Sequence, residues 1–170
     1  MSITIATAQD IPALVPLINS AYRGDASKKG WTTEANLLKG GLRTDEDFLT
    51  TLLSNSAASM LKYTVTDNSI NGCVYLEKME RGLYLGMLTV LPLQQAGGIG
   101  KQLLAAAEVY GKEKDCPCIF MNVISLRHEL IAWYERHGYR KTGETKPMPA
   151  DNRFGTPTQP LEFVIMEKLL

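Results

Sequence analysis

The 170-residue sequence has few of the residues that build metal and disulfide sites. It contains only three cysteines, Cys73, Cys116 and Cys118, and none of them stands in a Cys-x-x-Cys pair. The two histidines, His128 and His137, do not extend these thiols into a spacing typical of zinc sites. We therefore expect reduced thiols, no bound metal and a cytoplasmic location.

Excess charge and long apolar segments are also missing. Lys plus Arg and Asp plus Glu both number 18, which leaves a formal net charge of zero. Proteins that hold nucleic acid through a broad basic field need surplus Lys and Arg, so we expect no nucleic-acid partner. The longest apolar runs, such as residues 103–107, fall far short of the ~20 residues of a membrane-spanning helix. The first residues lack the basic start and apolar stretch of a signal peptide, so we expect no membrane association.

Length and periodicity define the expected fold. A chain of this size buries roughly 70% of its unfolded surface and is too short for two ordinary domains, so residues 1–170 should form one domain. Patterns with a period of two predict strands over residues 3–5, 60–66, 70–79 and 83–90. Residues 118–124 are expected to form a buried strand, and residues 139–144 and 163–166 two further strands. Apolar stripes at helical spacing predict helices from residue 11, over 31–43, from Thr44, over 99–110 and over 127–137.

Three local features refine this expectation. Thr7 or Asp10 should cap the first helix, and Pro16 should break or kink it. Residues 24–30 and the proline-rich segment 146–160 are expected to be loops. The strand–helix–strand step over residues 83–124 implies one parallel pair. The fold class is therefore α/β, with a mixed, mostly antiparallel sheet of six to seven strands flanked by about four helices.

A glycine-rich turn joins a predicted strand to the most regular predicted helix, with the sequence Gln-Ala-Gly-Gly-Ile-Gly-Lys over residues 95–101. Small residues let successive backbone amides face one anion, and the start of a helix adds roughly half a positive charge. The spacing does not match a nucleoside-triphosphate loop, because Gln95 and Gln102 occupy required Gly and Ser/Thr positions. A dinucleotide fingerprint is disfavoured because no acid follows at Met121–Ile124. Two interpretations of this turn therefore stay open: a site that binds a phosphate group, and a tight turn whose glycines serve packing alone.

Two motifs resemble one known family. Residues 85–92, Leu-Gly-Met-Leu-Thr-Val-Leu-Pro, lead into Gln95-x-x-Gly98-x-Gly100, which is similar to motif A of the GNAT superfamily of N-acetyltransferases. Further on, Tyr134-x-x-x-Gly138-Tyr139 is similar to a second motif of that superfamily. The order of predicted elements matches the superfamily from about residue 3 to residue 168. The resemblance therefore implies a GNAT-like acyl-CoA N-acyltransferase fold.

The resemblance implies that acetyl-CoA is the co-substrate. Its pyrophosphate would lie on the backbone amides of Gln95, Ala96, Gly97, Gly98, Ile99, Gly100 and Lys101. Its pantetheine arm would pair with the strand edge at Leu88, Thr89 and Val90, where two parallel strands separate. The amide of Val90 would polarise the thioester carbonyl. Arg127 and Leu130 occupy positions where many members have Asn and Ala, so the Asn-type contact to pantetheine is not carried over.

Acetyl transfer to an amine needs a proton donor for the thiolate and a route for the amine proton. The resemblance implies Tyr134 as the donor, whereas its place on a partly apolar helix face also suits a core aromatic. We predict Glu34 as the base, because it follows Trp31 in the variable substrate-side region, although an exposed structural Glu fits equally well. Other candidates for the base by residue type are Glu77, Glu129, Glu135 and His137.

The expected function is acetyl-CoA-dependent N-acetyl transfer, directly to a primary amine. The acceptor stays open among small amines, amino acids, polyamines and protein amines, and the neutral chain slightly favours a small molecule. A non-catalytic acyl-CoA-binding or regulatory module on the same fold is the main alternative, and a nucleotide-dependent oxidoreductase is a weaker one. A homodimer is possible, because dimers are common in the superfamily.

Overall fold

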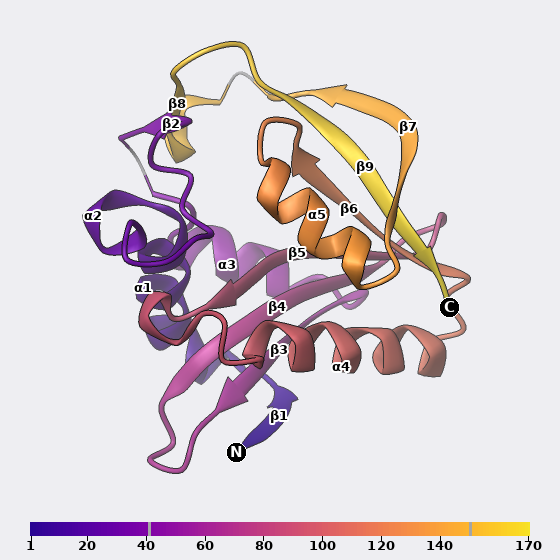
Figure 1. Cartoon of the computed structure of the whole chain (residues 1–170). Coiled ribbons are helices and arrows are strands. Elements are labelled where there is room, and N and C mark those ends of the chain that lie inside the picture. The colour runs from indigo at the N-terminus through magenta and orange to yellow at the C-terminus, as the bar shows by residue number, and fades with distance from the viewer. Residues whose placement is uncertain (41, 150) are drawn as a thin grey trace.

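The computed structural model describes residues 1–40, 42–149 and 151–170 (Figure 1). Seven strands form one sheet in the spatial order β1 (Ser2–Ile5), β3 (Ala58–Thr64), β4 (Ile70–Lys78), β5 (Leu83–Val90), β6 (Cys118–Ile124), β9 (Glu162–Leu169) and β7 (Arg140–Pro147). Two short strands, β2 (Leu38–Lys39) and β8 (Thr156–Pro157), form a separate pair. The helices are α1 (Ile11–Tyr22), α2 (Gly24–Ser27), α3 (Glu46–Leu53), α4 (Ile99–Glu113) and α5 (His128–Arg136). Single 3₁₀ turns cover Ala8–Asp10, Pro92–Gln94 and Asn152–Phe154.

The strand pairing confirms the predicted fold class. Every neighbouring pair in the large sheet is antiparallel except β5 and β6, which are parallel and joined through α4. A parallel pair needs such a crossover connection, whereas the β3–β4–β5 meander needs only short turns. The result is a mixed, mostly antiparallel sheet with helices on both faces.

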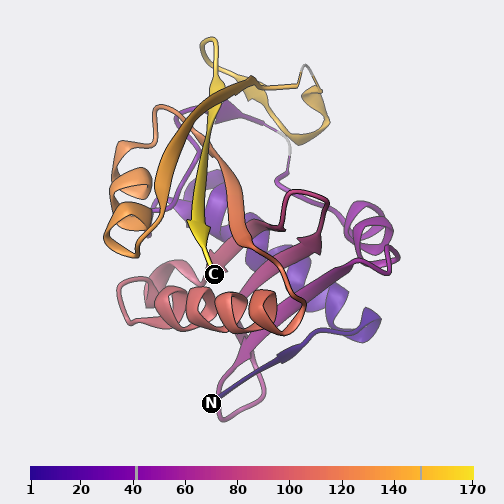
Figure 2. The ribbon, with the colours of Figure 1, turned by 90° about the vertical axis from the view of Figure 1, so that its right-hand side faces the viewer.

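Two hydrophobic clusters lie on opposite faces of the sheet. One joins α4 and α5 to the sheet, with Leu103 and Ile131 among its buried residues. The other joins α1 and α3 to the opposite face, with Leu14 and Leu49 fully buried. In Figure 1, α4 and α5 lie in front of the sheet and α1 lies behind it; Figure 2 gives the same layers from the side. The alternation of strand residues between these clusters explains why period-two patterns located the strands.

A bulge in β5 positions the site. Leu85 belongs to the cluster under α4, whereas Met87, two residues on, belongs to the cluster under α1. The pairing of β4 with β5 shifts register at this point, and Met87 has a left-handed φ of 49°. Such a bulge bends a strand and increases its twist. Beyond it β5 leaves β6, so that these two strands pair only at Leu83–Ile119 and Tyr84–Phe120.

One predicted helix is absent. In the described part of residues 31–43 the chain makes a turn over 35–37 and the strand β2, and no helix. The apolar residues that suggested a helix serve tertiary contacts instead: Leu38 is buried in a third cluster, and the Glu34 amide donates to the Tyr22 carbonyl. Gly41, predicted to help end that helix, lies outside the described residues.

Details near other helices also differ from the predictions. Pro16 lies inside α1, which neither breaks nor ends there, because packing of the apolar face offsets the lost hydrogen bond. Asp45, not Thr44, caps α3, and its carboxylate accepts from the amide of Phe48 at 2.8 Å. The predicted loops at 24–30 and 146–160 contain α2 and β8, respectively.

Candidate active site

The separation of β5 from β6 opens a cavity of about 580 Å³. Its walls come from the end of β5, the turn before α4, the start of α4 and one face of α5. Side chains from residues 31–32 close one side of it. Three of its aromatic residues are in contact with one another, with Trp133 4.3 Å from His137 and 6.3 Å from Trp31 between ring centroids.

The start of α4 presents backbone amides to this cavity. The N-cap residue Gly98 has φ 85°, Ala96 before it has φ 70°, and no side chain caps the helix. The first intrahelical bond is the one from the Gln102 amide to the Gly98 carbonyl, so the amides from Gly98 to Lys101 precede the hydrogen-bond ladder. A Cβ at Gly100 would lie 3.6 Å from Trp133 and Val90, inside the cavity wall. Free amides at a helix N-terminus suit a phosphate or pyrophosphate, so these residues fit the one in CoA.

The backbone of Val90 also faces the cavity. Leu91 donates its amide to the Asn71 carbonyl of β4, and Gly72 and Val90 form the next pair along the ladder. Antiparallel ladders alternate hydrogen-bonded and non-hydrogen-bonded pairs, so the amide and carbonyl of Val90 point away from β4. The Val90 carbonyl accepts from Gln95 Nε2 at 3.1 Å, which agrees with this direction. The Val90 N–H therefore points to the side where β6 has separated.

The Gln95 side chain ties the two walls of the cavity together. Its Oε1 accepts from the amides of Trp31 and Thr32, at 2.8 and 3.3 Å. Its Nε2 donates to Thr32 Oγ1 at 2.7 Å in addition to the Val90 carbonyl. A Cβ at Gly30 would overlap the amide end of this side chain, so a larger residue there would displace Gln95. One side chain thus joins the end of β5 to the loop over residues 30–32.

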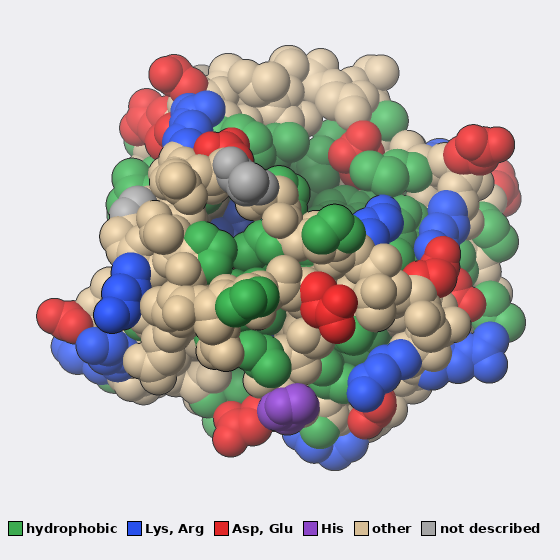
Figure 3. Space-filling model, turned by 90° about the horizontal axis from the view of Figure 1, so that it is seen from above, with side chains coloured by type: hydrophobic (Ala, Val, Ile, Leu, Met, Phe, Trp, Pro, Cys, Tyr) green, Lys and Arg blue, Asp and Glu red, His purple; other side chains and the backbone are tan. Residues whose placement is uncertain are grey.

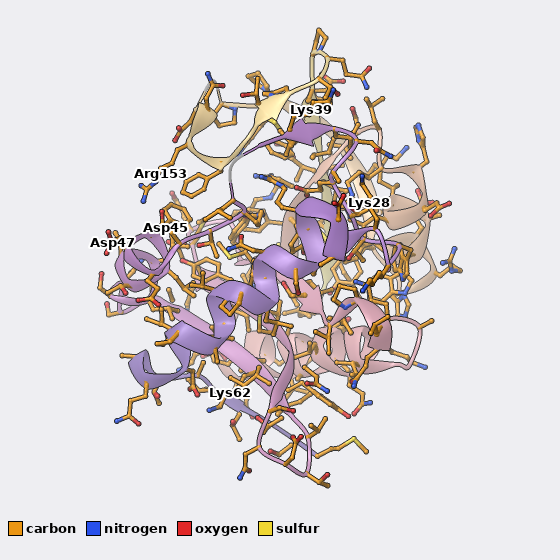
Figure 4. All side chains as sticks on the ribbon, turned by 90° about the vertical axis from the view of Figure 1, so that its left-hand side faces the viewer. Lys28, Lys39, Asp45, Asp47, Lys62 and Arg153 are labelled. Atoms are coloured by element: carbon orange, nitrogen blue, oxygen red, sulfur yellow. The ribbon has the colours of Figure 1, made fainter. Side chains whose placement is uncertain are left out.

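A second cavity, of about 410 Å³, lies on the other side of the strand edge. It is roofed by β2, β8 and the turn at Asn152–Phe154, and in the view from above its mouth is a hollow with largely hydrophobic walls (Figure 3). The roof is held by the Arg153–Asp45 ion pair at 2.6 Å, whose labelled side chains point toward one another in Figure 4, and by Phe154 on Phe48. The two cavities share five lining residues, Tyr22, Leu88, Arg127, Leu130 and Tyr134.

Two tyrosines dominate this junction. Tyr134 is 5% exposed, and burial raises the pKa of its phenol well above the ordinary range. The Tyr22 hydroxyl donates to the Leu88 carbonyl, and burial raises the pKa of Tyr22 to about 12 although Arg127 and Arg43 act to lower it. Because desolvation disfavours the phenolate, both hydroxyls keep their protons at neutral pH. Because Tyr22 already donates its proton to the Leu88 carbonyl, Tyr134 supplies the hydrogen-bond donor at the point where the cavities meet.

Glu34 lies at the centre of a buried charge network. Its Oε2 accepts from Arg23 Nη2 at 3.1 Å and its Oε1 from Arg127 Nη1 at 3.2 Å. The three side chains are 7–9% exposed. Arg127 also donates to the Thr32 carbonyl at 2.6 Å, and Arg23 donates to the Phe154 carbonyl. Both carboxylate oxygens thus hold guanidinium groups, and the network connects the loop of the first cavity to the roof of the second.

The predicted site residues fall into three groups. The first cavity is lined by Leu88, Val90, Gln95, Ala96, Gly98, Gly100, Lys101 and Tyr134. Glu34 lines the second cavity only. Thr89, Gly97 and Ile99 line neither: Thr89 is 1% exposed with its hydroxyl on the Met87 carbonyl, and Ile99 lies in the core under α4. Their backbone amides, not their side chains, are what the prediction requires.

The other candidates for a base are spread out. Glu129 and His137 line the first cavity, but neither belongs to the five junction residues. Glu77 accepts from Tyr75 and Asn55 and lines neither cavity. Tyr22 was missed by the sequence reasoning, because its only signal was a polar end on an apolar helix, which says nothing about a shared cavity. Arg43 ends the segment 31–43, which the sequence places on the substrate side, and it lines the second cavity.

Within the described ranges, no three His, Cys, Asp or Glu side chains are grouped so that they could hold a metal ion. Among the described helices, none has both the length and the hydropathy needed to cross a bilayer.

The fold and motifs match known proteins. Ribosomal-protein-alanine N-acetyltransferase from Brucella melitensis is similar over 100% of both chains, with a TM-score of 0.75 and 20% identity. A putative streptothricin acetyltransferase from Bacillus anthracis in complex with acetyl coenzyme A is similar over 71% of this chain and 67% of its own, with a TM-score of 0.60 and 19% identity. Ribosomal-protein-S18-alanine N-acetyltransferase from Escherichia coli has a TM-score of 0.73 and 14% identity over 99% and 92% of the two chains.

A search of curated protein sequences finds no match. These structural likenesses, all at 20% identity or less, establish the fold. The family assignment comes from the sequence model of the acetyltransferase (GNAT) family, which matches residues 17–139. That match covers most of the chain, including both cavities' junction, the glycine-rich turn and α5. The chain therefore belongs to the GNAT acetyltransferase family.

Proposed function

We propose that the protein transfers the acetyl group of acetyl-CoA directly to the primary amine of a small molecule. The observation that carries this proposal is the junction of the two cavities. The first cavity leads from the free amides of α4 to the Val90 N–H, and the second opens on the same five residues from the opposite side. A long phosphorylated donor and a compact acceptor can therefore meet at one point.

The donor fits the first cavity by chemistry. The amides from Gly98 to Lys101 would hold the pyrophosphate, and Lys101 and Arg136 add positive charge nearby. After the bulge β5 no longer pairs with β6, and its carbonyls at Leu88 and Val90 bond to Tyr22 and Gln95, so the Val90 N–H is the backbone group that this edge offers to the donor. The thioester carbonyl would then accept a hydrogen bond from the Val90 N–H.

The reaction needs four changes of bonding. The amine nitrogen attacks the thioester carbon, and the negative charge that develops on the carbonyl oxygen is stabilised by the Val90 N–H. As the tetrahedral centre collapses, the carbon–sulfur bond breaks and the sulfur takes the electron pair. Tyr134 donates a hydrogen bond to that departing sulfur. The amine nitrogen loses one proton to solvent and the sulfur takes up one proton from solvent, so CoA leaves as the thiol.

The amine must be neutral when it attacks, and charge around the junction favours that form. The five junction residues include Arg127 but no carboxylate or histidine, and Arg43 lies 5.6 Å from the Tyr22 ring centroid. Nearby cations lower the pKa of an ammonium group. A dedicated base is therefore not required, and we assign Glu34 to positioning Arg23 and Arg127 instead.

A covalent acetyl-enzyme is disfavoured by the thiols. Cys73 is fully buried, and burial raises its pKa to about 12, so almost none of it is thiolate at neutral pH. Cys116 and Cys118 are also buried, and they line neither cavity. The direct transfer described above needs no protein nucleophile.

A small acceptor is favoured by the volume of the second cavity, about 410 Å³. The β2–β8 pair and the Asn152–Phe154 turn line one side of it, and the turn is held by the Arg153–Asp45 pair and by the bond from Arg23 to the Phe154 carbonyl. These elements leave more room for a small amine than for a folded protein.

The test is release of CoA thiol from acetyl-CoA with a panel of small amines. Tyr134→Phe should lower kcat by at least ~100-fold while the Kd for acetyl-CoA changes less than about threefold. Tyr139→Phe is the matched control, because Tyr139 packs on Tyr134 at 5.7 Å in the same core but lines neither cavity. Tight CoA binding without turnover on any amine would instead favour a non-catalytic acyl-CoA-binding module.

A further inference from the structure

The acceptor cavity carries more positive than negative charge. Its charged lining residues are three arginines and two acids, namely Arg23, Arg43, Arg127, Glu34 and Asp151. The Glu34 carboxylate is shared between Arg23 and Arg127, and Asp151 accepts from the backbone amide of Arg153 at 2.9 Å. Arg43 is left with no carboxylate partner among the described residues. A guanidinium that lines a cavity without a counter-ion favours an anionic ligand group.

The backbone of Arg43 is held firmly in place. Its amide donates to Asn19 Oδ1 at 2.8 Å, and the next residue, Thr44, donates to the same oxygen at 3.0 Å. Asn19 Nδ2 in turn donates to the Thr44 carbonyl at 3.0 Å. Three hydrogen bonds to α1 thus fix the position from which the half-buried Arg43 side chain reaches the cavity. Such preorganisation reduces the entropic cost of ordering a ligand contact.

Arg43 lies close to the point of acetyl transfer. Its guanidinium carbon is 5.6 Å from the Tyr22 ring centroid, and the hydroxyl of that ring is bonded to the Leu88 carbonyl at the junction. Tyr22 thus contacts both Arg43 and the backbone at the junction. A compact acceptor that reaches both places would carry its anionic group and its amine close together, as an amino acid does.

Two buried polar atoms of the cavity lining have no hydrogen-bond partner among the described residues, Arg23 Nε and Asn122 Oδ1. A buried amide oxygen without a partner costs about 1–3 kcal/mol. The remaining walls are mostly apolar, with Met87, Met121, Val123 and Phe163 among them. The cavity therefore combines guanidinium groups with unused donors, one unpaired amide oxygen and an apolar surface.

From these observations we infer that the acceptor is an amine bearing a carboxylate, an amino acid with an apolar side chain, and that Arg43 binds its carboxylate. The inference rests on the proposed acetyl transfer, because it names the substrate class of that same site. Arg43 holds the carboxylate, the apolar walls take the side chain, and the amine is directed to the junction beside Tyr134. Acetylation removes the positive charge of the amine, so the product is a net anion.

The experiment compares acids with matched amines that lack the carboxylate. The purified full chain is assayed for CoA thiol release with alanine, leucine, methionine and phenylalanine, with their amides, and with their decarboxylated amines. An α-amino group beside an amide carbonyl has a pKa of about 7.7–8.0, so intrinsic reactivity at neutral pH favours the amides. We expect the opposite order, with kcat/KM for at least one acid tenfold or more above that of its amide and its decarboxylated amine.

Substitutions of Arg43 test whether this residue causes the preference for the carboxylate. Arg43→Gln should reduce the acid-to-amide ratio of kcat/KM to about one, and should lower kcat/KM for the acid at least tenfold more than kcat/KM for the decarboxylated amine. Arg43→Lys should retain part of the preference, because it keeps the charge but loses the planar fork. Amines acetylated with no preference for the carboxylate would overturn the inference and leave the proposed function standing. A preference that survives Arg43→Gln would overturn the role of Arg43, and no turnover on any amine would overturn the proposed function itself.

Discussion

Replacing Glu34 by Gln separates a positioning role from a catalytic one. The substitution keeps the size of the side chain and removes the charge that holds Arg23 and Arg127 at 3.1 and 3.2 Å. Burial already lowers the pKa of Arg23, and Glu34 is the partner that acts against this effect. Without the carboxylate, two guanidinium groups face each other with no counter-ion in a region that is 7–9% exposed.

The expected loss of stability is large. Breaking a buried ion pair by removing one partner costs about 3–5 kcal/mol, because the other charge stays buried and unpaired. For a chain of this size each kcal/mol lowers Tm by about 2–4 °C, so Tm should fall by about 6 °C or more. Urea unfolding, followed by intrinsic fluorescence, gives the same quantity as a change in the midpoint at constant m-value. Glu129→Gln is the matched control, since this exposed Glu should change stability by less than about 0.5 kcal/mol.

The second part of the test is to measure kcat at a low temperature, where nearly all of the variant stays folded. With the folded fraction held near one, Glu34→Gln should lower kcat by less than tenfold, whereas loss of a general base costs about 10²–10⁴-fold. A double variant with Arg127→Gln should lose less stability than the two single variants together, with a coupling of about 0.5–3 kcal/mol. Unchanged stability together with a kcat lowered more than 100-fold would refute the positioning role and restore Glu34 as the base.

Three further changes test other parts of the site. Gly98→Ala should destabilise the fold by about 1–2 kcal/mol, because φ is 85° at this position, and should also weaken acetyl-CoA binding. Calorimetry measures both effects. An unaltered Kd would contradict pyrophosphate binding by the amides at the start of α4. Gly30→Ala should raise the KM for acetyl-CoA by displacing Gln95, whose side chain lies 2.4 Å from the added Cβ, whereas the open Gly24 position should leave KM alone. The pKa of Tyr22 is raised to about 12, above its unfolded value of about 10, so the stability it contributes is complete below pH 10 and is lost as pH rises toward 12. Unfolding midpoints from pH 8 to 12 should show this decline, and Tyr22→Phe should reduce it.

Most of the fold could be predicted because its signals are local. The two-residue period of the meander, the apolar stripe of α4 and the glycine-rich turn each lie in one short window, and the structure has all three. The helix predicted over 31–43 is absent because contacts from distant segments decide that region. Gln95 holds Trp31 and Thr32, and β8 pairs with Leu38 and Lys39.

The chemistry of the site was less predictable than its location. The ion pair between Arg127 and Glu34 joins residues 93 positions apart, and the bond from Tyr22 to Leu88 spans 66. The periodicity of a sequence does not reveal contacts between residues so far apart. Glu34 was therefore interpreted as a free carboxylate and Tyr22 as the end of an apolar helix. In the sequence, Arg127 is only a departure from the family pattern. In the structure it lines both cavities and so connects them.

The central claim is that the start of α4 and the edge of β5 hold acetyl-CoA through backbone amides. The most direct measurement is a titration of the ¹⁵N-labelled protein with acetyl-CoA, followed by amide chemical shifts. The account predicts the largest changes at Val90 and at Gly98–Lys101, with smaller ones around Tyr134. Saturable binding that leaves these amides unmoved and perturbs another surface would contradict it.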